Sequence, residues 1–231
     1  MRLPIDEFGE RNCLRLDFDV FTFYIGMFCN PLCIDGHAHE DFLSYVVYCE
    51  TAEVLVDPGR SSFSVGSASS VVAQSHNGLS DVEESLSHLR RFFSNRRLRS
   101  EPRKRGGELT PARGVRLWAR NTLTGLYRQL SLEQTERGVS VEETLHHPSR
   151  PIKAHFGHLL PDLTPTLSGN KVFLPGAGCT IIYDTPAERA SLLPSVRSPS
   201  YGEERPCKRL QVEVDSGQER TVTIRWTISR I

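Results

Sequence analysis

The sequence predicts an all-β protein, an antiparallel β-sandwich with few short helices. Three observations lead to this fold class. Apolar and polar residues alternate with a period of two in several segments. Other segments are short runs of β-branched and aromatic residues, which favour strands. The spacers between them carry Gly, Pro, Ser, Asn and Asp at intervals typical of sandwich proteins. We expect a single domain over residues 1–231, a length that gives enough interior for one large core.

The first predicted strand is Leu14–Val20, in which Leu, Phe and Val alternate with charged residues. A hairpin follows: the β-branched and aromatic run Phe42–Cys49 leads through a short turn at 50–53 into Val54–Val56, which a Pro-Gly pair ends. The same signals predict later strands at Val115–Ala119, Tyr127–Leu132, Val139–Leu145, Ala154–Leu160, Lys171–Leu174, Thr180–Tyr183, Leu210–Val214 and Thr221–Ile228.

One segment interrupts this pattern. Asp81–Phe93 has apolar residues at three- and four-residue spacing behind Ser80, which predicts either one helix or an irregular excursion. Residues 90–105 then hold eight Arg or Lys against one acid. We therefore expect an irregular basic insertion at about 81–112, either a solvated loop or a cradle for a polyanionic substrate. A nucleic-acid patch is disfavoured, because only Phe92 and Phe93 interleave with the basic residues.

The charge balance argues against partners that a strong field would attract. The 28 basic and 28 acidic residues give a formal net charge of zero, so no global field steers the chain toward nucleic acid or a membrane. No window approaches 18 uninterrupted apolar residues, and the acidic segment Met1–Glu7 is unlike a secretory signal. The chain as it stands is expected in the cytoplasm, unless its natural N-terminus lies elsewhere. Six cysteines without CxxC pairs leave both free thiols and disulfides open.

Four polar residues form the candidate site: His37, His39, Asp57 and His76, each beside turn-forming residues. Imidazole nitrogens and a carboxylate suit zinc, and three or four such ligands define a site. The same residues could instead be ordinary loop residues, or serve proton abstraction with His37 as acid, base or charge-neutralising donor. Pairing the hairpin about its turn places Asp57 opposite roughly Val46, about 20 Å from His39. A common site therefore requires residues 37–41 to leave the strand and curl back over the sheet.

The motifs together resemble the C-terminal β-sandwich portion of the heparinase II/III-like polysaccharide lyases. The residues that carry the resemblance are His37–Ser44 (HAHEDFLS), Leu55–Gly59 (LVDPG) and Ser75–Asn77 (SHN), with support from Gly138–Glu143, His155–Leu163 and Ser198–Glu203. The resemblance covers most of the chain, from about residue 15 to the end.

The resemblance implies specific roles. His39, Asp57 and His76 would bind a structural Zn²⁺, and His37 would lie beside the substrate, where it neutralises the uronate carboxyl or helps the proton transfer. The reaction would be β-elimination on an acidic polysaccharide. Members of this family usually carry a helical α/α toroid before this domain, and that toroid supplies the acid/base tyrosine. About 35 residues precede the His motif here, so no residue matches that tyrosine, and the substrate-binding residues are unknown.

The resemblance also bears on partners. It implies a separate toroid domain or chain, and many family members are periplasmic or secreted. A sandwich that normally docks on a toroid keeps an exposed patch, so we expect self-association of the isolated chain. The alternative to a lyase portion is a non-catalytic, zinc-stabilised β-sandwich that binds carbohydrate or packs against another domain.

Overall fold

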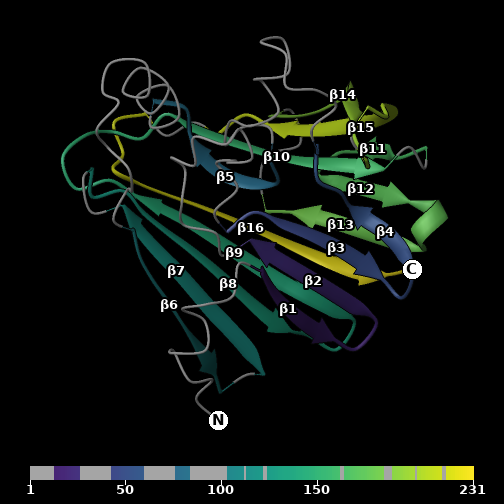
Figure 1. Cartoon of the computed structure of the whole chain (residues 1–231), viewed down its shortest axis with the longest axis horizontal. Helices are drawn as coiled ribbons and strands as arrows, with labels where there is room; N and C mark the ends of the chain where they lie inside the picture. The colour runs from purple at the N-terminus through teal and green to yellow at the C-terminus, as the bar shows by residue number, and fades with distance from the viewer. Residues whose placement is uncertain are drawn as a thin grey trace.

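The computed structural model describes residues 13–26, 43–59, 76–83, 103–111, 113–121, 124–161, 164–184, 189–200, 202–214 and 217–231. These residues form three antiparallel sheets (Figure 1). Helix is scarce among them: the 3₁₀ helix η3 (Pro175–Ala177), the helical residues 82–83 and the 3₁₀ residue Arg189. In this part of the chain no helix is long and apolar enough to cross a membrane. The predicted all-β class, antiparallel with few short helices, is confirmed.

The sheets differ in size. The first is the meander β1 (Cys13–Phe18), β2 (Phe21–Gly26), β3 (Tyr45–Cys49), β4 (Ala52–Leu55). The second has the order β14 (Ala190–Arg197), β15 (Arg205–Val212), β10 (Ala154–Pro161), β5 (Gly78–Asp81). The large sheet has the order β11 (Thr166–Ser168), β12 (Lys171–Leu174), β13 (Cys179–Tyr183), β16 (Thr221–Arg230), β9 (Gly138–His146), β8 (Tyr127–Gln134), β7 (Gly114–Asn121), β6 (Arg103–Thr110).

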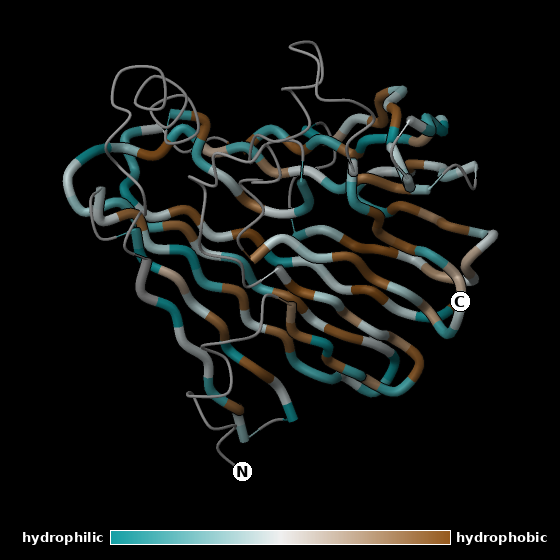
Figure 2. The backbone as a smooth tube through the Cα atoms, in the orientation of Figure 1, coloured by the Kyte–Doolittle hydropathy of each residue, from teal (hydrophilic) through white to brown (hydrophobic). Residues whose placement is uncertain are grey.

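The large sheet forms one layer of the sandwich, and the first and second sheets lie on it side by side. Trp226 on β16 shows both contacts: its ring lies 5.7 Å from Tyr45 of the first sheet and 4.7 Å from His158 of the second. The two smaller sheets meet where Val56 N–H donates to Leu159 O at 2.9 Å. Brown and teal alternate along the strands, because every second residue enters the core between the layers (Figure 2).

The predicted hairpin is present, with one change of register. Val47 pairs with Leu55 and Tyr48 with Glu53, so a β-bulge at Val54 shifts the register by one residue within the hairpin. The later predicted strands correspond to β7, β8, β9, β10, β12, β13, β15 and β16.

Five strands were not predicted, and two of them have clear reasons. β14 contains Pro194, which suits an edge strand, and β14 is the edge of the second sheet. β6 has two glycines and few apolar residues, and its residues 103–110 lie in the stretch that was expected to be irregular. Asp81, the first residue of the expected helix, instead ends β5. Residues 84–102, which carry most of that helix and of the basic run, lie outside the described residues.

Candidate functional site

Two of the four predicted site residues lie side by side. Nδ1 of His76 is 2.9 Å from Oδ2 of Asp57, although the residues are 19 positions apart. The His76 side chain is 2% exposed, whereas that of Asp57 is 43% exposed. The carboxylate therefore reaches the surface above a buried imidazole. His37 and His39 lie outside the described residues, so the structure does not place them.

The backbone after β4 positions Asp57. Its Oδ1 accepts a hydrogen bond from Gly59 N–H at 2.8 Å, and Ser198 N–H donates to Pro58 O at 2.7 Å. Gly59 has φ +60°, and a Cβ atom there would lie 1.8 Å from Ser198 O. Only glycine fits this close approach. The Asp57 turn is thus held against the segment after β14, which begins one of the supporting motifs in the sequence.

The residue after His76 positions the imidazole. Asn77 is 2% exposed, and its amide donates to Tyr45 O at 2.6 Å and to Val56 O at 2.9 Å. Its Oδ1 accepts from Leu159 N–H at 2.6 Å. One side chain therefore satisfies backbone groups of β3, of the chain leaving β4 and of β10. Because these three segments meet at Asn77, His76 is fixed beside Asp57.

A buried polar network adjoins this pair. Glu143 on β9 is fully buried, and its carboxylate accepts hydrogen bonds from Tyr45 Oη at 2.5 Å and from Leu79 N–H at 2.8 Å. Arg128 lies 3.1 Å away and the Trp226 indole 3.3 Å away as further donors. A buried carboxylate needs such a set, since an unpaired charge in the interior is very costly.

The network fixes the tautomer of His158. A carboxylate only accepts, so the Tyr45 hydroxyl donates to Glu143 and must itself accept from His158 Nε2, 2.7 Å away. His158 Nδ1 then accepts from the Tyr183 hydroxyl at 2.7 Å. Burial lowers the pKa of His158 to about 3, with a smaller contribution from the charge of Arg209. The imidazole is therefore neutral, with its proton on Nε2.

The same burial removes two tyrosines from acid/base chemistry. Burial, reinforced by the charge of Glu143, raises the pKa of both Tyr45 and Tyr183 well above that of a free phenol. Both hydroxyls are also held in hydrogen bonds inside the core. We assign them a structural role.

The donor atoms of Asp57 and His76 suit zinc in type. An imidazole nitrogen and a carboxylate oxygen bound tetrahedrally at about 2.0–2.2 Å would lie about 3.4 Å apart. The observed 2.9 Å is about half an ångström shorter than that, and at this distance the two groups form a hydrogen bond. Among the described residues, no group of three or more His, Cys, Asp or Glu side chains could hold a metal. A zinc site that includes this pair would need a third ligand from a segment outside them, and His39 is the residue that the sequence predicts.

The Glu143–His158 network was not predicted. Its signal is present in the alternation: Glu143 lies between the core residues Val141 and Leu145, and His158 lies between Phe156 and Leu160. An ionisable residue at a core-facing position of a strand needs a partner. His147, which follows β9, is 5% exposed, and its Nδ1 accepts hydrogen bonds from the backbone amides of Ser149 and Arg150. These bonds give it a structural role.

Comparison with known proteins shows a match to one family model and to solved structures of the same fold. The family model described as heparinase II/III-like, C-terminal, matches residues 21–227. No curated protein matches the sequence. A mutant of heparan sulfate lyase HepC from Pedobacter heparinus is similar in structure, with a TM-score of 0.67 at 14% identity, over 94% of this chain and 34% of that chain. The heparinase III BT4657 gene product gives a TM-score of 0.68 at 10% identity, over 95% of this chain and 34% of that one. The chain thus spans about a third of the length of these enzymes.

Proposed function

The chain belongs to the heparinase II/III-like C-terminal family, and from this premise we propose that it is the β-sandwich portion of a lyase that cleaves uronate-containing glycans by β-elimination. The observation that supports this most directly is the Asp57–His76 pair. Two residues of separate family-like motifs meet at 2.9 Å, at the junction of the two smaller sheets.

In this proposal His39, Asp57 and His76 hold a zinc ion. The ion would join the segment before β3, the turn after β4 and the segment before β5 into one rigid unit. The backbone contacts of Gly59 hold the turn after β4 in place, and those of Asn77 hold the segment before β5. Neither set of contacts depends on the ion. The role of the zinc is structural.

The chemistry concerns the uronate carbon next to the carboxylate. A base removes the proton from this carbon, and the electron pair of the C–H bond forms a carbon–carbon double bond. The bond to the neighbouring glycosidic oxygen breaks, and that oxygen leaves with a proton. His37 would lie beside the carboxylate and neutralise it or help the proton transfer, which lowers the cost of the carbanion-like state.

Among the described residues, no tyrosine can be assigned as the base. Tyr45 and Tyr183 are locked in the core network, and Tyr24, Tyr48 and Tyr127 lie on strands β2, β3 and β8. Tyr201 lies outside the described residues. We therefore propose that an α/α toroid, in the same protein or in a separate chain, supplies the tyrosine and the other wall of the substrate cleft. The non-catalytic reading, a zinc-stabilised sandwich for carbohydrate binding or domain packing, rests on this same lack of an assignable base.

Metal analysis of the purified chain tests the site. We expect about one zinc ion per chain in the native sequence and loss of the ion in His39→Ala, Asp57→Ala and His76→Ala. His146→Ala is the matched control, because His146 is an exposed histidine whose side chain bonds to Thr221. Unchanged zinc in Asp57→Ala would remove the site.

Activity separates the two functions. Ultraviolet absorbance of the unsaturated uronate product reports elimination on heparan sulfate. We expect none from residues 1–231 alone, and product when a toroid encoded with this chain is present. Product from this chain alone would contradict the proposal that the base lies elsewhere. No product with the toroid present would favour the non-catalytic function.

A further inference from the structure

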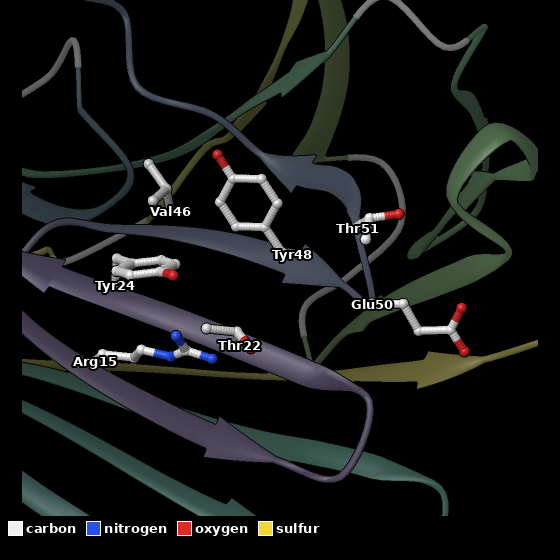
Figure 3. Close-up of a pocket in the computed structure, with 7 residues that line it drawn as sticks. All are labelled: Arg15, Thr22, Tyr24, Val46, Tyr48, Glu50 and Thr51. Carbon is white, nitrogen blue, oxygen red and sulfur yellow. The ribbon is translucent and has the colours of Figure 1, made fainter.

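A second candidate site lies on the outward face of the first sheet, away from the core. A cleft of about 450 Å³ is lined there by residues of β1, β2, β3 and the turn after β3 (Figure 3). Cross-strand pairing builds it: Arg15 pairs with Tyr24, and Thr22 pairs with Tyr48. Their sequence neighbours, such as Phe23, point into the core. Strand alternation therefore builds most of the cleft, and the turn residues Glu50 and Thr51 complete its lining.

Two tyrosine rings form a corner in this cleft. The rings of Tyr24 and Tyr48 are 5.9 Å apart at 84°, an edge-to-face pair, and the Arg15 guanidinium carbon lies 5.8 Å from the centre of the Tyr24 ring. Aromatic faces carry partial negative charge and attract groups with positive edges. The C–H face of a pyranose ring is such a group, so this corner suits a sugar.

Polar groups around the corner are available to a ligand. In the described part of the chain, no hydrogen bond engages the hydroxyls of Tyr24, Tyr48 or Thr51. Asp17 occupies Nε and Nη2 of Arg15, at 3.0 to 3.1 Å, which leaves the two donors on Nη1. Burial raises the pKa of Tyr48, so its hydroxyl remains a neutral donor. Hydroxyl donors and acceptors beside an aromatic ring are the groups that recognise sugar hydroxyls.

Charges in the cleft nearly cancel. Arg15 is paired with Asp17, and Glu50 is paired with Arg230 at 2.9 Å. The carboxylate of Glu50 points away from the tyrosines (Figure 3). Such a cleft recognises ring faces and hydroxyls more than charge. Large apolar anchors of the kind that bind proteins are also missing here, because the exposed large apolar residues of the described chain are Leu193, Val196 and Ile231.

We propose that this cleft is an accessory glycan-binding site, which holds one sugar ring of a uronate-containing chain against Tyr24 and Tyr48, with Arg15 Nη1 donating to it. The volume is in the range of small-ligand sites. The choice of a uronate glycan as ligand rests on the proposed function; the cleft itself does not. The site would retain the polymer near the enzyme without taking part in elimination.

Calorimetric titration of the full chain with a non-sulfated tetrasaccharide of alternating glucuronate and N-acetylglucosamine tests the proposal. We expect saturable binding that Tyr24→Ala and Tyr48→Ala each weaken about ten-fold or more. Tyr24→Phe, which keeps the ring, should weaken it only about two- to three-fold. Because the charges cancel, affinity should change little between low and physiological salt.

Two control variants separate this site from its alternatives. Arg225→Ala matches Arg15→Ala, because each arginine is about 60% exposed and is paired with a carboxylate on its own sheet. Arg15 lies in the first sheet, whereas Arg225 lies in the large sheet. We expect weaker binding only in Arg15→Ala. His76→Ala should leave tetrasaccharide binding intact even though it removes zinc.

Other outcomes overturn the proposal. Binding that is lost in His76→Ala and kept in both alanine variants of the tyrosines would place the glycan at the Asp57–His76 site instead. Absence of binding by the native chain would refute the accessory site while leaving the zinc result unaffected. A change of oligomeric state in Tyr24→Ala without a change in glycan affinity would identify this face as a contact between copies of the chain.

Discussion

Replacing Glu143 with glutamine tests whether the buried network holds the layers of the sandwich together. Four donors converge on this carboxylate: the Tyr45 hydroxyl, the Leu79 amide, the Arg128 guanidinium and the Trp226 indole. A glutamine keeps one acceptor oxygen and places an NH₂ group where the other was. Two of the four donors then face a donor, and Arg128 loses the charge that it pairs with. The volume of the side chain hardly changes, so the effect is electrostatic.

The expected cost is large. A buried donor without an acceptor costs about 1–3 kcal/mol, and breaking a buried ion pair from one side costs about 3–5 kcal/mol. These contributions overlap, so we expect a loss of about 3–5 kcal/mol in the free energy of unfolding. At about 2–4 °C per kcal/mol for a domain of this size, the Tm should fall by about 10 °C.

Urea unfolding followed by tryptophan fluorescence measures this loss, because Trp226 lies in the network. The matched control is Glu142→Gln, the adjacent residue on the opposite face of β9. Glu142 is paired with Arg225 at 2.6 Å, but the Arg225 side chain is 61% exposed. An exposed pair is worth less than about 1 kcal/mol. Similar losses in the two variants would refute the role given to the buried network.

Two further predictions follow from burial and exposure. Acidification should destabilise the protein. Burial lowers the pKa of His158 from 6.5 to about 3 and that of His155 from 6.5 to about 4. The unfolded chain therefore binds more protons than the folded chain below pH 6.5. Stability should decline as the pH falls from 6.5 toward these values, and the curve of Tm against pH should be flatter in His158→Gln; an unchanged slope would contradict this. Leu193 and Val196 are 43% and 54% exposed on the edge strand β14, so the chain should self-associate at high concentration. Light scattering should show a monomer for Leu193→Lys with Val196→Lys, and a monodisperse native monomer would argue against the prediction.

Much of the fold was predictable because strand alternation is a local property. The period of two along β9 and β16 reports which face of each strand meets the core, and the turn residues report where strands end. β2 carries the same signal in Phe23 and Ile25 and could have been found by it. β6 and β14 could not, since two glycines in one and Pro194 in the other are tolerated only through their neighbours in the sheet.

The candidate site divides in the same way. The sequence by itself determined which residues have ligand chemistry, since His39, Asp57 and His76 stand in motifs that resemble one family. Only the tertiary structure decided that Asp57 meets His76, because that contact depends on Asn77 joining three segments of the chain and on Gly59 approaching Ser198.

The same distinction explains the network and the outer cleft. Tyr45 meets Glu143 across 98 residues and His158 across 113, and no local pattern encodes such a distance. Tyr24 and Tyr48 form a corner because β2 and β3 pair in one register out of several. Alternation along a strand determines which face of the sheet a side chain occupies. The register of strand pairing and the packing of sheets determine which other side chains it contacts.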